Sequence, residues 1–328
     1  MNKKILAIVS FCLIAVAIGL FVAVSAGAKN IPFSTVVASI FDYQPELDMQ
    51  LVRDIRIPRA LSTLLVGGLL GVTGAMMQGV TRNPIAEPSL MGITQGATLA
   101  IAIGYAFPAF SGLFSTSAAA FLGAMVSGGL VLAFTMQQTR SLNLSRLLLA
   151  GTALSTFFIS LASVIALLTN RSQNLAFWIS GGFRTADWQS VQLLLVVGGI
   201  CTVLAMLLAS RINIVNLGED VAIGLGENPV KIRIVTLLLI IPMCAISVSV
   251  AGNIAFVGLI VPHMIRKMIG QDYRIILPLS FLLGGTLLVW SDVLARLVDQ
   301  PYETPIGLFT TLIGVPFFIW MVRKERSA

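Results

Sequence analysis

The chain has 328 residues, of which 57% are hydrophobic and only 11% are Asp, Glu, Lys or Arg. Soluble domains contain about 45–50% apolar and about 25% charged residues, so this composition excludes an ordinary soluble protein. The net charge of +7 is explained by membrane topology and by anionic lipids at the cytoplasmic face, and no nucleic acid partner is expected.

Long stretches without charge alternate with short charged gaps. Five intervals contain no Asp, Glu, Lys or Arg between their end residues: 59–82, 87–140, 146–171, 187–211 and 233–266. A helix of about 20 apolar residues crosses the hydrocarbon core of a bilayer. The pattern therefore predicts an all-α integral membrane protein with many spans.

The first apolar segment, 5–26, follows two lysines in the manner of a signal peptide. Its apolar part is longer than the roughly 7–15 residues of a signal peptide, so a retained helix is predicted. Further spans are predicted at 60–80, 87–108, 117–138, 146–169, 189–210, 234–251, 254–269, 275–297 and 305–322, all within one transmembrane domain, 1–328. Pro84 and Pro88 near the third span, and Gly252 between the seventh and eighth, indicate short or broken helices, which need protein or water beside them.

Basic residues set the expected orientation. With ten alternating spans and a cytoplasmic N-terminus, 14 of the 21 Lys and Arg residues, Arg140 and Arg326 among them, fall inside and 7 fall outside. Cytoplasmic loops of membrane proteins carry the excess of positive charge. We therefore predict a multi-pass protein of the plasma or inner membrane with both termini in the cytoplasm.

Residues that could carry chemistry are few. Cys12, Cys201 and Cys244 each lie in an apolar stretch and fit no metal-ligand spacing, so they are interpreted as small hydrophobic residues. The sole histidine, His263, has no obvious Cys or carboxylate near it in sequence, and the chain has no Gly-x-x-x-x-Gly-Lys-Ser/Thr loop. We expect no enzyme activity, no metal site and no cofactor; any ATP chemistry belongs to another subunit.

Small residues recur at four-residue spacing in two of the predicted spans. Gly67, Gly71 and Ala75 are one such series, with Gly74 beside it, and Gly123 with Ser127 is another. This spacing allows helix backbones to approach closely in a membrane. The series predict a dense bundle without large domains outside the bilayer.

Three stretches are more polar than a simple anchor requires. The segment 53–59 holds three arginines at the predicted outer mouth of the second span, where either a solvated helix end or a docking site is consistent with the composition. The segment 78–88 contains two prolines and is interpreted as a rigid turn. The segment 216–229 combines short apolar pieces with Gly and Pro, which favours a docking surface over a flexible linker.

The first two of these stretches overlap a set of five motifs that follow one another along the chain. The motifs are Ile55–Arg59, Gly74–Gln78, Asn83–Pro88, Gly258–Arg266 and Pro301–Gly307. Together they resemble the signatures of the permease family of ABC importers for iron siderophores, haem and cobalamin, from about residue 53 to the C-terminus. The resemblance implies a ten-helix, type II importer permease whose second to fifth and seventh to tenth spans form an inverted repeat.

The resemblance also implies partners and roles for individual residues. The expected partners are a cytoplasmic ATPase dimer, a second permease subunit, an extracytoplasmic substrate-binding protein and membrane lipid. By resemblance, Arg56, Arg59 and Arg296 would dock the binding protein, although Asp292 stands four residues before Arg296 and a local ion pair is the alternative. In the segment 216–229, the residues expected to couple the chain to the ATPase are Glu219, Ala222, Leu225 and Gly226.

The same resemblance suggests a gate and a transport path. Asn83 and Ile85 would narrow the cytoplasmic mouth, unless their turn merely connects two spans. The path would follow residues 155–184 and the helix after Pro305. Trp178 lies in that stretch but near a predicted membrane boundary, where aromatic residues are common, and a boundary role is favoured for it.

Two alternatives to a siderophore importer remain open on the sequence. Haem or cobalamin would suit the same family, but the chain lacks a Met, His or Tyr cluster for ligation of haem iron, which favours a ferric siderophore. A secondary transporter driven by an ion gradient would need a charged residue in mid-membrane. Glu87, Asp292 and Arg296 lie toward predicted span ends, which disfavours that class.

Overall fold

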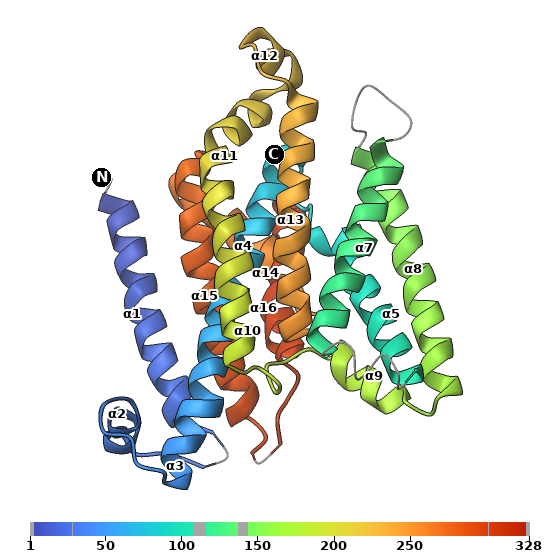
Figure 1. Ribbon diagram of the computed structural model, residues 1–328. Coiled ribbons are helices and arrows are strands. Elements are labelled where there is room, and N and C mark those ends of the chain that lie inside the picture. Colours follow the sequence, from blue (N-terminus) through green and yellow to red (C-terminus); the bar gives the residue numbers. More distant parts are fainter. Residues whose placement is uncertain (1–2, 28, 108–115, 137–143, 301, 326–328) are drawn as a thin grey trace.

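The structure is a computed structural model that describes residues 3–27, 29–107, 116–136, 144–300 and 302–325. Arg140, Arg326 and the last residues of the predicted spans 87–108 and 117–138 lie outside these ranges. The described chain folds into helices and connecting loops, with no strand. Most of the long helices run side by side in one bundle (Figure 1).

A helix lies within each of the ten ranges predicted to span the membrane. The longer helices are α1 (Lys3–Ser25), α4 (Ile57–Thr81), α7 (Thr116–Met136), α8 (Leu144–Leu168), α11 (Gly199–Leu217), α13 (Pro229–Ala251), α15 (Tyr273–Leu297) and α16 (Ile306–Glu325). The shorter ones are α2 (Phe33–Phe41), α3 (Leu47–Gln50), α5 (Ile93–Ala106), α9 (Ser172–Ile179), α10 (Trp188–Leu193), α12 (Glu219–Gly224) and α14 (Val257–Ile269). Two π-helical segments, Leu51–Arg56 and Leu194–Gly198, and one 3₁₀ segment, Pro88–Met91, join them.

Seven continuous helical stretches in the described chain are long and apolar enough to cross a membrane. They are 3–25, 47–81, 116–136, 146–168, 188–217, 229–251 and 273–297. Helices α5 and α14 have 14 and 13 residues, about 20 Å at 1.5 Å per residue, which is less than the ~30 Å hydrocarbon core. The apolar part of α16, Ile306–Met321, is also shorter than the seven stretches.

The helices are interrupted near Pro88 and Gly252, as the sequence predicted. Helix α13 ends at Ala251, Gly252 has a positive φ of 66°, and α14 begins at Val257. The carbonyl of Ala251 accepts a hydrogen bond from the amide of Gly182 at 2.8 Å, so the broken backbone is satisfied inside the protein. Close to this break, where the Glu87 carboxylate accepts from the amide of Phe256, a 3₁₀ segment replaces the first turns of the predicted span 87–108.

Helix α4 forms the centre of the bundle and packs against α15, α13, α14 and α11. The contacts are close because glycines face the neighbouring backbones. A Cβ atom on Gly67 would lie 2.4 Å from the carbonyl oxygen of Gly284 in α15, and one on Gly74 would lie 1.9 Å from the carbonyl oxygen of Gly258 in α14. The tight packing predicted from the glycine spacing is confirmed.

Replacement of Gly74 by alanine should destabilise the bundle, because the added methyl group meets backbone atoms of α14 that cannot rotate away. Overpacking of this kind costs about 1–3 kcal/mol or more. The measurement is the thermal unfolding midpoint of the purified protein in mild detergent. Gly129→Ala in α7 is the matched control, since a Cβ there has no neighbour within 4 Å. Equal midpoints for the two variants would contradict the packing argument.

Candidate functional site

One end of the bundle carries a buried cluster of three arginines at the junction of α1, α4 and α15. Arg56 is 7% exposed and donates hydrogen bonds to the carbonyl oxygens of Val24, Ser25 and Lys29 at 2.5–2.9 Å. These carbonyls lie at the end of α1 and just after it, where no further helical turn satisfies them. Arg56 thereby fastens the end of α1 to the start of α4.

The other two arginines share a carboxylate. Arg59 contacts Asp292 at 2.9 Å and Glu303 at 2.6 Å. Arg296 contacts Asp292 at 3.1 Å and donates to the carbonyl oxygen of Ala23 at 2.9 Å. Asp292 is 1% exposed and both arginines are 8% exposed. The local Asp292–Arg296 pair considered from the sequence is present, while the docking role of the three arginines stays a prediction.

Glu303 extends this cluster to the loops at the same end of the bundle. Its second carboxylate oxygen lies 3.2 Å from Arg184, in the segment between α9 and α10, and Arg184 also donates to the backbone carbonyl of Glu303 at 3.0 Å. Burial acts to raise the pKa of Glu303, but its contacts with Arg59 and Arg184 lower it overall. The stability that these ion pairs contribute is therefore fully present when the pH is above the ordinary pKa of a glutamate. It is lost as the pH falls through the lowered pKa of Glu303.

The opposite end of the bundle carries α12, which stands clear of the other helices (Figure 1). Val221, Ile223 and Leu225 are 46–61% exposed there, whereas Ala222 is fully buried. Glu219 lies 3.7 Å from Arg233 of α13, and Gly226 has a φ of 80° in a position that other residues adopt with strain. The predicted coupling residues therefore form one protruding turn with an exposed apolar surface.

The turn that holds Asn83 and Ile85 follows α4. The side-chain oxygen of Asn83 accepts from the amide of Ile85 at 3.1 Å, and Ile85 is 42% exposed. Four residues beyond Asn83, the Glu87 carboxylate accepts from the amide of Phe256 at 3.1 Å, at the start of α14. The sequence did not predict this link, since Glu87 is 169 residues away from Phe256.

Gln78 forms a second link between α4 and α14. Its amide nitrogen donates to the carbonyl oxygens of Gly258 and Leu259 at 3.2 Å, and its amide oxygen accepts from Arg266. The one sequence signal for this role is a polar Gln within a predicted span. Buried polar groups in a membrane form hydrogen bonds with other buried groups.

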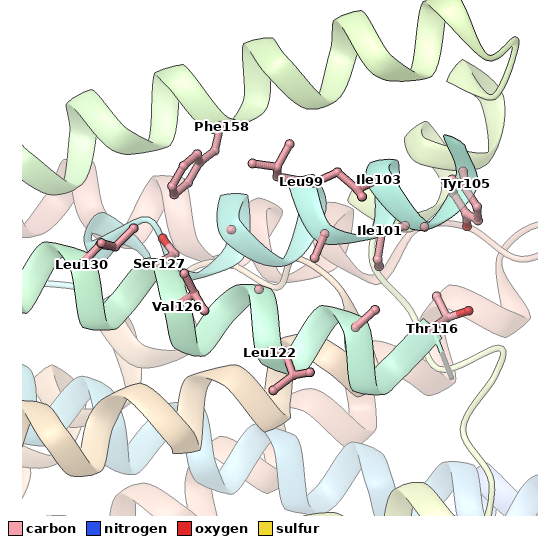
Figure 2. Close-up of a pocket in the computed structure, with 15 residues that line it drawn as sticks. Leu99, Ile101, Ile103, Tyr105, Thr116, Leu122, Val126, Ser127, Leu130 and Phe158 are labelled. Atoms are coloured by element: carbon pink, nitrogen blue, oxygen red, sulfur yellow. The ribbon is translucent and has the colours of Figure 1, made fainter. Parts of the chain in front are cut away.

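A cavity with a volume of about 460 Å³ lies between α5, α7 and α8. Figure 2 shows Phe158 and Leu130 at one end of it and Tyr105 and Thr116 at the other. Its lining holds no charged side chain and three hydroxyl groups, of which that of Ser127 already donates to the carbonyl oxygen of Gly92. The cavity is apolar and provides no ligands for a metal ion.

Catalytic and metal-binding groups are scattered. Among the described residues no three His, Cys, Asp or Glu side chains lie close enough to hold a metal ion. The three cysteines are buried and free of disulfides. His263 is 6% exposed and packs edge-on against Phe317 at 5.7 Å. The fold defines a helical membrane protein with seven stretches long and apolar enough to span the bilayer in the described chain.

Comparison with known proteins identifies the family. The family model described as the FecCD transport family matches residues 14–324. The chain is 42% identical to the iron(3+)-hydroxamate import system permease protein FhuB of Bacillus subtilis (strain 168), over 98% of this chain and 84% of that one. It is 36% identical to the hemin transport system permease protein HmuU of Yersinia pestis, over 84% of this chain and 83% of that one.

A solved structure supports the same assignment. An inward-facing conformation of a putative metal-chelate type ABC transporter has a TM-score of 0.83 and 27% identity, and the match covers 99% of this chain and all of the other. The chain belongs to the FecCD transport family, whose members are permeases of iron-siderophore and haem ABC importers. It is a multi-pass permease subunit of an ABC transporter and has no catalytic role of its own.

Arg59→Leu should lower the stability of the bundle strongly, because it leaves the Asp292 carboxylate buried with half of its ionic partners removed. Breaking a buried pair costs about 3–5 kcal/mol. Arg184→Gln removes a half-exposed partner of Glu303 and should cost less than about 1 kcal/mol. Thermal unfolding in detergent measures the stability of both variants. A smaller loss of stability for Arg59→Leu than for Arg184→Gln would contradict the structural role of the buried Arg59–Asp292 ion pair.

Proposed function

We propose that this chain is the permease subunit of an ATP-driven importer that brings a ferric siderophore into the cell. The observation that carries the proposal is the match along almost the whole chain to permeases of ferric-chelate import systems, with 42% identity to one for iron(3+)-hydroxamate. An iron(3+)-dicitrate permease of Escherichia coli (strain K12) is 39% identical over 86% of each chain. Haem is the second candidate, supported by the likeness to the hemin permease.

The proposed orientation places α12 and both termini in the cytoplasm. The start of α1 and the end of α16 lie toward the α12 end of the bundle (Figure 1). Lys3 and Lys4 begin α1, Arg323 is in the last turn of α16, and Arg211, Lys231 and Arg233 flank α12. This concentration of positive charge at one end is what the cytoplasmic side of a membrane protein shows. The arginine cluster of α4 and α15 then faces outside.

We further propose that the second to fifth and the seventh to tenth predicted spans form an inverted repeat. Helix α4 is followed by a break and the short helix α5, and α13, which runs the opposite way, is followed by a break and the short helix α14. Ile85-Ala86-Glu87 precedes the 3₁₀ start at Pro88, and Ile254-Ala255-Phe256 precedes the start of α14. In each half two further helices follow, α7 with α8 and α15 with α16.

The protruding α12 segment is proposed to bind the ATPase. Its apolar side chains Val221, Ile223 and Leu225 are exposed although Ala222 is packed inside, so these three side chains are left uncovered by the described part of the chain. Such an exposed apolar face, rimmed by Glu219, Asp220 and Glu227, is typical of a protein contact. The Asn83–Ile85 turn lies at the same end and is proposed to narrow the cytoplasmic mouth, with Glu87 fixing its position through Phe256.

Gly226→Val should uncouple ATP hydrolysis from uptake while leaving the bundle folded. The space around Gly226 is open, but its φ of 80° strains a β-branched residue, so the end of the α12 segment must change shape. The measurement compares ATPase activity with substrate uptake in proteoliposomes. Gly224→Ala is the control, because it adds a methyl group to the same segment at a helical residue with open space. Uptake at the full rate in Gly226→Val would contradict the coupling role.

Arg56, Arg59 and Arg296 are proposed to organise the outer surface on which the binding protein docks, and the exposed Arg53 and Arg184 lie near them. Arg56→Glu should weaken the stimulation of ATP hydrolysis by the binding protein, because it reverses charge and releases the end of α1. Arg53→Glu is the exposed control for charge alone. Unchanged stimulation in Arg56→Glu would exclude Arg56 from docking.

The proposed substrate is tested by uptake in a strain that lacks this permease. The strain would be supplied with radiolabelled iron as ferric hydroxamate, ferric citrate or ferric enterobactin, and with hemin, with and without the restored gene. Restoration of uptake for one of the siderophores supports the proposal. Restoration for hemin alone would replace it with the haem alternative. Co-purification of an ATPase with the permease tests the importer class independently of the substrate.

A further inference from the structure

A second cavity lies between the last turns of α11 and the first turns of α13, beneath α12. Its volume is about 230 Å³, and it is open at one side. The lining residues are Leu208, Arg211, Gly226, Glu227, Asn228, Lys231, Ile232 and Val235. Both helices belong to stretches that are long and apolar enough to cross the membrane, so this cavity lies where the hydrocarbon core gives way to the headgroups.

The lining of this cavity changes from apolar to charged along the helix axes. On α11, Leu208 lies one turn deeper in the bundle than Arg211, and on α13, Val235 lies one turn deeper than Lys231. Both basic residues thus line the cavity at its charged end, and Ile232 adds to the apolar part below them. This order is that of a phospholipid, whose charged phosphate sits above its acyl chains.

The charges at the mouth favour an anion. Arg211 and Lys231 contribute two positive charges and Glu227 one negative charge. Glu227 lies 3.7 Å from Arg211, which is longer than a hydrogen bond, so the guanidinium keeps donors for another acceptor. Within the described chain no partner is found for the Lys231 ammonium, whose backbone amide is bonded to the Asn228 side chain at the start of α13. The positive end of the α13 dipole adds to the same field.

We propose that this cavity binds the headgroup of an anionic phospholipid, with its phosphate between Arg211 and Lys231 and an acyl chain along Leu208 and Val235. Basic pockets between membrane helices on the cytoplasmic side are suited to such headgroups. A free phosphate ion would contact Arg211 and Lys231 but would leave the apolar side chains below them uncovered. The placement in the inner leaflet rests on the proposed orientation, whereas the lipid site itself does not.

The test uses the purified full-length permease alone, in mild detergent, and native mass spectrometry with added phosphatidylglycerol or phosphatidylcholine. Preferential retention of phosphatidylglycerol is expected. The double variant Arg211→Gln/Lys231→Gln should lower its affinity roughly 25-fold, since each basic residue near an anionic lipid contributes roughly fivefold. Lys3→Gln/Lys4→Gln is the matched control, because it removes the same charge from another exposed pair at the α12 end.

A charge variant at the mouth of the cavity and competition by inorganic phosphate test the lipid site further. Glu227→Gln should raise the retention of phosphatidylglycerol, because it removes the one negative charge at the mouth. Inorganic phosphate at the same ionic strength as a chloride control should not displace the lipid. Equal retention in the double variant and its control, or displacement by phosphate alone, would overturn the lipid site. Neither result depends on uptake or ATPase activity, so a failure here leaves the transport proposal untouched.

Discussion

The close contact of the α4 backbone with α15 and α14 is the constraint on which the bundle depends. Gly67 and Gly74 face carbonyl oxygens of their neighbours at distances that leave no room for a side chain. In a membrane, helices gain little from excluding apolar surface from water, so their association relies on packing and hydrogen bonds at close range. The buried polar links of Gln78 and Glu87 are formed at this same junction.

Much of the fold could be predicted because a membrane protein needs long uncharged segments to cross the bilayer, separated by short segments that contain Lys and Arg. Each predicted range contains a helix, and the breaks near Pro88 and Gly252 follow from local backbone chemistry. Short or broken helices were expected there, but the exact starts of α5 and α14 could not be predicted, because mean apolarity does not show where a helix is replaced by a 3₁₀ segment or a loop. The irregular backbone is stable there only because distant residues satisfy it.

The candidate sites also differ in how far local residues could predict them. The α12 segment was predicted as a docking surface from its own residues, since Gly, Pro and apolar positions are local signals, and that role stays a prediction. The arginines at the other end were predicted as outward docking residues, yet their burial depends on Asp292 and on carbonyls of α1. The contact of Arg59 with Asp292 joins residues 233 positions apart, and that of Arg56 with Val24 joins residues 32 positions apart, so no property of a short segment shows them.

A continuous set of contacts joins α12 to the centre of the bundle. Arg233 of α13 lies 3.7 Å from Glu219 of α12 and donates to the carbonyl oxygen of Val80 in α4 at 3.3 Å. Two residues before Val80, Gln78 holds α14. A displacement of α12 must therefore either break the contact with Arg233 or move with the end of α4, whose glycine contacts leave little freedom to bend without α14 and α15. Rigid close packing therefore links α12, through Arg233 and the end of α4, to α14 and α15.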